Sequence, residues 1–183
     1  MLDGKRILLI IGGGIAAYKC LELIRRAREK GLGVRAIMTR AAEQFVTPLS
    51  VSSLSGNRVF TDLFSLTDEA EMGHIELSRS ADLIVVAPAT ADLMARMAAG
   101  LASDLATTAL LATDTPVLIA PAMNGKMWEH PATRANVETL RSRGVQFIGP
   151  EEGLLACGYE GIGRLWPVEG IEEAIETLLA GKD

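Results

Sequence analysis

Three consecutive glycines, Gly12, Gly13 and Gly14, stand between an apolar run and a helical pattern near the amino terminus. The backbone N–H groups of such a turn, together with the dipole of the following helix, form an anion site that suits a phosphate. The same letters satisfy the dinucleotide fingerprint G-x-G-x-x-A, which expects an acidic side chain where the second strand ends. Thr39 and Arg40 occupy that place instead. We therefore predict a phosphate site, and keep two alternatives: an NADP-dependent oxidoreductase that uses Arg40, and a turn without a ligand.

Two further apolar runs end in the same three letters, Ala-Pro-Ala, at 87–89 and 120–122. Proline lacks an N–H donor and ends the pairing of a strand, and alanine leaves room for a flat ring to approach the backbone. Asn124, just beyond the second run, offers both a donor and an acceptor to an amide or carboxylate ligand. It would equally cap a helix over 125–129. The ends of these two runs are therefore candidate walls of a binding site.

A parallel sheet would bring these segments together, and the rest of the chain predicts one. Short runs rich in Ile, Val and Leu, without polar alternation, are typical of strands buried on both faces. Helical patterns separate them, which favours right-handed crossovers. We expect an α/β fold with a doubly wound parallel sheet, helices on both faces, and ligands at the carboxyl ends of the strands. The apolar runs span 7–11, 34–38, 83–87, 117–120 and 145–148. The helices are expected over 17–30, 91–111 with a break near Gly100, 131–143 and 168–180.

Length, charge and cysteine content narrow the class of protein. The 183 residues predict a single domain, 1–183, and 18 Lys and Arg against 23 Asp and Glu give a net charge of −5. This charge does not favour nucleic acid or an anionic membrane surface, and every apolar run is shorter than the ~18–20 residues that cross a bilayer. Cys20 and Cys157 form neither a disulfide framework nor a zinc pattern, so we expect reduced thiols, no metal site and a cytoplasmic protein.

The segment 149–167 has five glycines and two prolines, and we expect a flexible loop that covers substrate.

Four segments stand in this order along the chain: GGIAAYK at 13–19, GHIEL at 73–77, PAMNGKMW at 121–128 and ACG at 156–158. Together they resemble the flavin-dependent cysteine decarboxylase family, and the likeness spans nearly the whole chain. It is closest to the members that act on phosphopantothenoylcysteine. It implies a Rossmann-like flavoprotein fold, FMN as cofactor, and homo-trimers or dodecamers built from trimers. In bifunctional relatives a phosphopantothenate–cysteine ligase domain follows, so a monofunctional protein and an excised domain both remain open. One departure is Gly12, where the family often has a Ser or Thr that contacts the FMN phosphate.

The family chemistry explains how a carboxylate beside an ordinary sp³ carbon can lose CO₂. By resemblance, FMN oxidises the cysteine thiol of N-[(R)-4′-phosphopantothenoyl]-L-cysteine to a thioaldehyde, whose C=S bond accepts the electron pair that CO₂ leaves behind. Reduced FMN then returns a hydride and an acid supplies a proton. The product that the resemblance implies is 4′-phosphopantetheine, with no net redox change.

The resemblance also implies roles for three catalytic side chains. His74 would act as a general base or polarising group near the flavin of a neighbouring subunit. Asn124 would hold the substrate carboxylate and amide, and Cys157 would protonate the intermediate as a thiol acid. Arg164 would meet the substrate phosphate. The implied substrate contacts are Asn124, Met123, Met127 and Arg164. The implied cofactor contacts are Gly13, Gly14, Ile15, Thr39, Phe45, Pro88, Ala89, Thr90, Ser103 and Ala122.

Three alternatives keep the same fold. A regulatory subunit that binds FMN tends to lack one catalytic residue, whereas His74, Asn124 and Cys157 occur together here. A flavin prenyltransferase is not expected to keep the Met-Asn-x-x-Met-Trp segment. A peptidyl-cysteine decarboxylase remains open, because only the closer overall likeness favours phosphopantothenoylcysteine.

Overall fold

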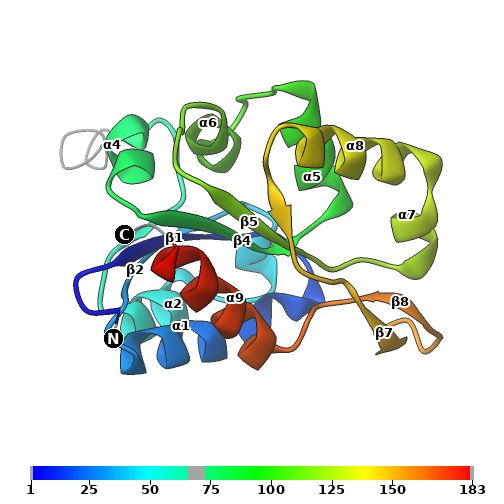
Figure 1. The fold of residues 1–183 in the computed structure, drawn as a ribbon, viewed down its shortest axis with the longest axis horizontal. Helices are drawn as coiled ribbons and strands as arrows, with labels where there is room; N and C mark the ends of the chain where they lie inside the picture. The colour runs from blue at the N-terminus through cyan, green and yellow to red at the C-terminus, as the bar shows by residue number, and fades with distance from the viewer. Residues whose placement is uncertain (1, 66–72, 182–183) are drawn as a thin grey trace.

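The centre of the molecule is a six-stranded parallel sheet in the order β3-β2-β1-β4-β5-β6 (Figure 1). A computed structural model describes residues 2–65 and 73–181. Strand β1 starts in the middle of the sheet, and the later strands are added first on one side of it and then on the other. The switch point of this doubly wound sheet therefore lies between β1 and β4. The expected fold class is confirmed. The strands are β1 (Arg6–Ile11), β2 (Gly33–Met38), β3 (Val59–Phe60), β4 (Leu83–Ala89), β5 (Val117–Pro121) and β6 (Gln146–Phe147).

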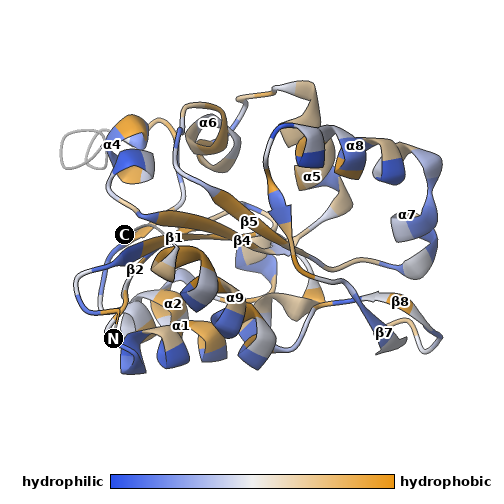
Figure 2. Cartoon of the chain, in the orientation of Figure 1, coloured by the Kyte–Doolittle hydropathy of each residue, from blue (hydrophilic) through white to orange (hydrophobic). Residues whose placement is uncertain are grey.

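Strand β1 is buried on both faces because its side chains alternate between two hydrophobic cores. Ile7, Leu9 and Ile11 belong to one core, and Leu8 and Ile10 belong to the other. Figure 2 shows that the central strands are mostly hydrophobic and that the helices carry both polar and hydrophobic residues. The first core is closed by α1 (Lys19–Glu29), α2 (Pro48–Ser55) and α9 (Val168–Ala180). The second is closed by α4 (His74–Arg79), α5 (Ala91–Ala99), α6 (Leu105–Leu111), α7 (Gly125–Glu129) and α8 (Pro131–Ser142).

The helix expected over 91–111 is broken where glycine predicts a break. Helix α5 ends at Ala99 and is followed by Gly100, whose φ of +70° is the left-handed conformation that favours glycine. Helix α6 then begins after Asp104, which forms a reciprocal cap with Thr107. The sequence patterns do not predict β3 or α2. Strand β3 has only two residues, and α2 carries four serines in eight residues, so neither shows a clear hydrophobic period.

The segment 149–167 differs from the loop that its glycines and prolines suggest. It contains an antiparallel hairpin of β7 (Glu151–Leu154) and β8 (Glu160–Arg164). Gly153 lies within β7 and Gly163 within β8, with φ of +156° and +145°. These glycines therefore belong to the strands of a hairpin and not to a loop. Its role as a cover for substrate stays a prediction. Across the described ranges, none of the helices is both long enough and apolar enough to span a bilayer.

A buried carboxylate ties the last helix to the first. The Glu172 side chain on α9 is 5% exposed and accepts a 2.6 Å hydrogen bond from Arg26 Nε on α1. Lys30 Nζ lies 3.4 Å from the other carboxylate oxygen. A charge removed from water in this way is tolerated because both of its oxygens have cationic partners. The pairing fixes the docking of α9 on the face of the sheet that α1 covers.

We predict that Glu172→Gln lowers the free energy of unfolding by about 1–3 kcal/mol, because a buried charge-assisted hydrogen bond is lost. Urea unfolding followed by circular dichroism measures the change. Glu169→Gln is the matched control, since Glu169 also faces Arg26 but is 62% exposed at 3.5 Å. Glu169→Gln should lower the free energy of unfolding by less than about 0.5 kcal/mol. Equal losses in the two variants would contradict this account of α9.

The two cysteines have opposite environments. Cys20 on α1 is buried and donates a 2.9 Å hydrogen bond from Sγ to Ala87 O, whereas Cys157, between β7 and β8, is exposed. Burial raises the pKa of the Cys20 thiol to about 12. Cys20 therefore carries almost no thiolate at neutral or mildly alkaline pH.

We predict that iodoacetamide at pH 8 modifies one thiol per folded chain, at Cys157, and two per chain in denaturant. Peptide mass spectrometry identifies the modified position. The rate at Cys20 should remain low until the pH nears about 12, because the thiolate forms only as the pH rises through the raised pKa. Rapid modification of Cys20 in the native protein at pH 8 would show that this part of the core opens readily.

Candidate functional site

The glycine turn after β1 packs against two backbone segments that leave no room for side chains. Gly12 N donates a 3.1 Å hydrogen bond to Pro88 O at the end of β4. A Cβ on Gly12 would lie 2.3 Å from that oxygen, and a Cβ on Gly13 would lie 2.3 Å from the Ala41 Cβ. Gly14 faces open space and leads into the short 3-10 helix η1 (Ile15–Tyr18). Glycine is therefore required at two positions by close approach.

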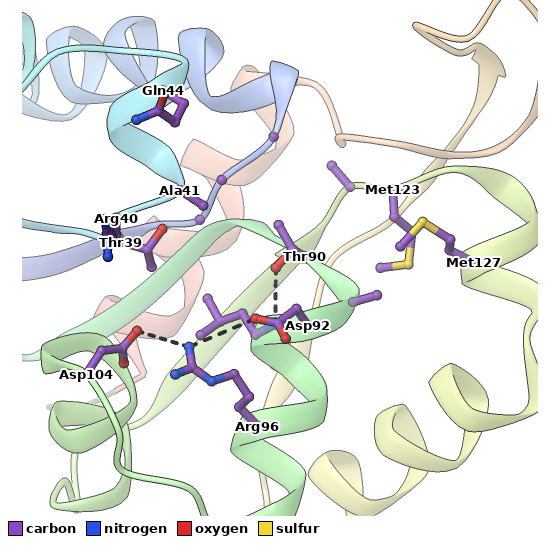
Figure 3. A pocket seen from close by; sticks show the side chains of 16 residues that line it. Thr39, Arg40, Ala41, Gln44, Thr90, Asp92, Arg96, Asp104, Met123 and Met127 are labelled. Carbon is purple, nitrogen blue, oxygen red and sulfur yellow. Dashed lines mark hydrogen bonds and ion pairs between the residues drawn. The ribbon is translucent and has the colours of Figure 1, made fainter.

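A large cavity of about 910 Å³ opens beside this turn, at the carboxyl ends of β1, β2, β4 and β5 (Figure 3). This is the place where doubly wound sheets bind ligands. Thr90, at the end of β4, caps α5 by accepting a 3.1 Å hydrogen bond from Leu93 N. Thr39, at the end of β2, accepts a 3.1 Å hydrogen bond from Ala42 N of the 3-10 helix η2 (Ala42–Gln44). The cavity is lined by Gly12, Gly13, Gly14, Thr39, Arg40, Ala41, Gln44, Thr90, Ala91, Asp92, Leu93, Arg96, Asp104, Ala122, Met123 and Met127.

One wall of this large cavity carries an organised charge cluster. Arg96 Nη1 on α5 donates a 3.0 Å hydrogen bond to Asp104 Oδ2 and lies 3.9 Å from Asp92 Oδ2, as Figure 3 shows. Arg96 Nη2 also donates to Ser103 Oγ. Partial burial alone would raise the pKa of the Asp104 carboxyl, but hydrogen bonds from Thr107 and the Arg96 guanidinium outweigh it and lower that pKa below its usual value. Asp104 therefore stays ionised at neutral pH.

A second, smaller cavity of about 520 Å³ adjoins the first. Gly14, Ala122 and Met123 line both, so the two cavities share a wall. The smaller cavity lies between the start of α1, the segment after β5, and the β7–β8 hairpin. Its other lining residues are Ile15, Ala16, Tyr18, Lys19, Asn124, Leu154, Leu155, Ala156, Cys157, Gly163, Arg164 and Leu165.

The hairpin is held against the segment after β5 by close backbone contacts. Met123 N donates a 2.8 Å hydrogen bond to Gly163 O. A Cβ on Gly163 would lie 2.1 Å from Met123 O, and a Cβ on Gly125 would lie 2.9 Å from Ile162 O. This docking brings Cys157 Sγ within 3.7 Å of Asn124 Nδ2.

Asn124 caps α7, as one of the two interpretations of its position predicts, and its role toward a ligand stays a prediction. Its Oδ1 accepts a 2.8 Å hydrogen bond from Lys126 N, so it caps α7. Because the cap occupies the oxygen, the Nδ2 group is left to face Cys157 in the smaller cavity. Arg164, across the same cavity, has its Nε 3.6 Å from Glu151 Oε2 and is half-exposed.

Most of the predicted site residues line one of the two cavities, and some do not. Pro88 and Ala89 support the glycine turn or the sheet without lining either cavity, and Phe45 is exposed beside η2. Ser103 does not line the larger cavity, but it accepts a hydrogen bond from Arg96, which does. His74 is the half-buried first residue of α4 and lies outside both cavities of its own chain. Those that line a cavity are Gly13, Gly14, Ile15, Thr39, Thr90, Ala122, Met123, Asn124, Met127, Cys157 and Arg164.

Sequence reasoning missed the charged wall and the basic edge of the smaller cavity. Arg96 and Asp92 stand four residues apart on a helix, which is also the pattern of a solvated surface pair. The Asp-x-x-Thr pattern at 104–107 predicts a helix cap but does not reveal that the cap faces a cavity. Tyr18 and Lys19 belong to the glycine-turn motif and line the smaller cavity, which nothing in the motif indicates. Among the described residues, no three His, Cys, Asp or Glu side chains gather as a metal site would require.

Comparisons with known proteins agree with this architecture. The model of the Flavoprotein family matches residues 1–180. Curated proteins named coenzyme A biosynthesis bifunctional protein CoaBC are 55% identical over 181 residues in Vibrio cholerae and 53% identical over 164 residues in Escherichia coli. These alignments cover 99% and 90% of this chain. The chain spans less than half of the length of these relatives, 45% and 40%.

Solved structures match over almost the full length. A PPC decarboxylase variant complexed with pantothenoylaminoethenethiol is 30% identical with a TM-score of 0.84, covering 96% of this chain and 98% of its own. The FMN-dependent cysteine decarboxylase SpaF is 30% identical with a TM-score of 0.85, covering 99% of this chain and 98% of its own. Because the family model matches residues 1–180 and the fold matches these solved structures, the chain belongs to the Flavoprotein family.

Proposed function

We propose that this chain catalyses the FMN-dependent decarboxylation of 4′-phosphopantothenoylcysteine to 4′-phosphopantetheine, a step of coenzyme A biosynthesis. The proposal is supported by relatives named for coenzyme A biosynthesis and by structures named PPC decarboxylase. The observation that carries it is the shared wall of the two cavities. One cavity offers a glycine turn to a phosphate, and the other holds an amide and a thiol that face each other.

The residues of the larger cavity fit FMN. Within the described chain, the N–H groups of Gly13 and Gly14 have no hydrogen-bond partner, and they can donate to a phosphate without interference from a side chain. Thr39, whose oxygen already accepts from Ala42 N, keeps its hydroxyl proton for the same phosphate. Thr90 and Ala122 would flank the rest of the cofactor. The departure at Gly12 therefore removes one side-chain contact but leaves the backbone donors.

When bound, the flavin supplies a two-electron acceptor that takes electrons from the substrate thiol and returns them after CO₂ has left. The protein must hold the substrate carboxylate without neutralising it, because an ion pair would stabilise the ground state and oppose loss of CO₂. Asn124 Nδ2 meets this need, since a neutral amide orients the carboxylate through hydrogen bonds. The cap on α7 keeps the oxygen of that amide turned away.

Cys157 is the proton donor in this proposal. It lies in the turn between β7 and β8, where Gly158 N donates a 2.9 Å hydrogen bond to Leu155 O. Its thiol can transfer a proton to the carbon that has lost CO₂, and its contact with Asn124 places it beside the group that held the carboxylate. Arg164 would bind the substrate phosphate in place of its present ion pair with Glu151.

We further propose a homo-trimer or a dodecamer of trimers, in which His74 acts in a neighbour's site. Its place outside both cavities of its own chain supports this, as does the exposure of the adjacent Ile75. A phosphopantothenate–cysteine ligase, fused or separate, would supply the substrate, consistent with relatives named bifunctional. A cytoplasmic location is proposed because a reducing compartment keeps the exposed Cys157 as a free thiol.

A peptide with a carboxyl-terminal cysteine is the second candidate substrate, because it presents the same reacting cysteine, and SpaF, also 30% identical, is named simply as an FMN-dependent cysteine decarboxylase. It would use the same two cavities and the same Asn124 and Cys157. Arg164 would then have no phosphate to bind.

We predict that the natively purified protein is yellow, releases FMN on denaturation, and produces CO₂ from 4′-phosphopantothenoylcysteine. A carboxyl-terminal cysteine peptide should react at least about 100-fold more slowly, because it lacks the phosphate that Arg164 can bind. Trapped CO₂ and mass spectrometry of the product measure both reactions. Absence of flavin, or faster turnover of the peptide, would contradict the proposed substrate and cofactor.

We predict that Cys157→Ser binds FMN like the parent protein but forms 4′-phosphopantetheine at least about 100-fold more slowly, because the proton donor is lost. The amount of CO₂ released should exceed the amount of 4′-phosphopantetheine formed. A decarboxylated, more oxidised species should therefore accumulate, and mass spectrometry detects it. Cys20→Ser is the matched control, since its hydroxyl can keep the hydrogen bond to Ala87 O. Normal product formation by Cys157→Ser would remove Cys157 from this role.

A further inference from the structure

Arg96 is the cation that the larger cavity holds in a fixed position. Its side chain is 25% exposed and has three partners, Asp104, Ser103 and Asp92. Arg40, the other arginine that lines this cavity, is exposed, and no hydrogen bond or ion pair holds it within the described ranges. In Figure 3 the Arg96 guanidinium lies on the cavity wall between its two carboxylate partners. A preorganised guanidinium loses less entropy when it forms a further hydrogen bond.

The charge around Arg96 selects the kind of group that it can bind. Two carboxylates, Asp104 and Asp92, lie within 4 Å of one guanidinium, so the cluster has a net charge of −1. A phosphate dianion is repelled by such a cluster, whereas a neutral polar group is not. The glycine turn, with unpartnered N–H groups on Gly13 and Gly14, is the better place for the phosphate.

The cluster nevertheless retains both donors and acceptors. Arg96 uses Nη1 and Nη2 for Asp104 and Ser103, and its Nε–H has no partner in the part of the chain that is described. The pyrimidine edge of a flavin ring is neutral when oxidised and presents carbonyl oxygens on both sides of an N–H group. Guanidinium donors beside carboxylate acceptors match that alternation.

We propose that Arg96 donates hydrogen bonds to the pyrimidine edge of the flavin ring, and that Asp104 and Ser103 are positioning residues that hold its guanidinium there. This inference rests on the proposed binding of FMN and adds to it which residue recognises the ring. It also gives Ser103 a role that does not require direct contact with the cofactor.

The test compares two ligands, FMN and riboflavin, which share the ring and differ in the phosphate. Fluorescence titration of the flavin-free protein measures both dissociation constants. Arg96→Met should weaken both ligands by the same factor, at least about tenfold, because a charge-assisted hydrogen bond to the ring is lost. Its bound flavin should also show a shifted visible absorption band. Arg96→Lys keeps the positive charge but lacks the planar guanidinium, so its dissociation constants should lie between those of the parent protein and Arg96→Met.

The role of Asp104 is tested by a double-mutant cycle. Asp104→Asn releases the guanidinium and should weaken both flavins, while Asp104→Asn combined with Arg96→Met should be no worse than Arg96→Met alone. Arg25→Met is the matched control, because Arg25 also lies on a helix between carboxylates, Glu22 and Glu29, but away from both cavities. It should leave both dissociation constants unchanged.

The inference would be overturned if Arg96→Met bound both flavins with unchanged affinity, or if the losses in the double variant were additive. It would also be overturned if Arg96→Met lost affinity for FMN alone, because that result would assign Arg96 to the phosphate. Thermal unfolding of each variant separates a binding defect from a folding defect, and Arg96→Lys keeps the test decisive if Arg96→Met does not fold. If the parent protein binds neither flavin, the proposed function itself fails. If it binds both and Arg96→Met binds them equally well, only the role of Arg96 fails.

Discussion

The hydrogen bond from Gly12 N to Pro88 O joins the turn after β1 to the end of β4 at the switch point of the sheet. Because Gly12 and Gly13 lack a Cβ, the turn can lie directly on Pro88 and Ala41, and its three glycines line the large cavity. A side chain at either glycine would push the turn outward. The crevice, the orientation of η1 and α1, and the shared wall at Gly14 all follow from this one close approach.

A second backbone contact positions the two polar side chains of the smaller cavity. Met123 N bonds to Gly163 O, and this places the hairpin turn that carries Cys157 beside the segment that carries Asn124. The cap that Asn124 provides to α7 is an ordinary structural interaction, yet it decides which end of the amide faces the smaller cavity. Local structure and site geometry are therefore not separable at this residue. The charged wall follows the same logic, since the cap of α6 at Asp104 also holds Arg96.

Much of this arrangement is encoded locally and was predictable. The unbroken apolar runs of β1, β4 and β5 predict strands buried on both faces, and the pattern over 168–180 matches α9. The hairpin was not predictable, because β7 has no buried residue, β8 has only one, and both strands carry glycines that usually indicate loops. The Arg96 cluster was missed because charged residues four apart on a helix look the same in solvent or on a cavity wall. The roles proposed for His74, Asn124 and Cys157 rest on resemblance to a family, since no periodicity distinguishes a lone histidine, asparagine or cysteine as catalytic.

The central claim is that a flavin sits at the carboxyl edge of the sheet, with its phosphate on the glycine turn and its ring toward the shared wall. A crystal structure of the protein grown with FMN tests this claim most directly. The account predicts electron density for one FMN per chain between Gly13, Thr39 and Thr90, with the smaller cavity still open toward Cys157. Flavin density elsewhere in the molecule, or a crevice closed by side chains in every copy of a crystal soaked with FMN, would contradict it.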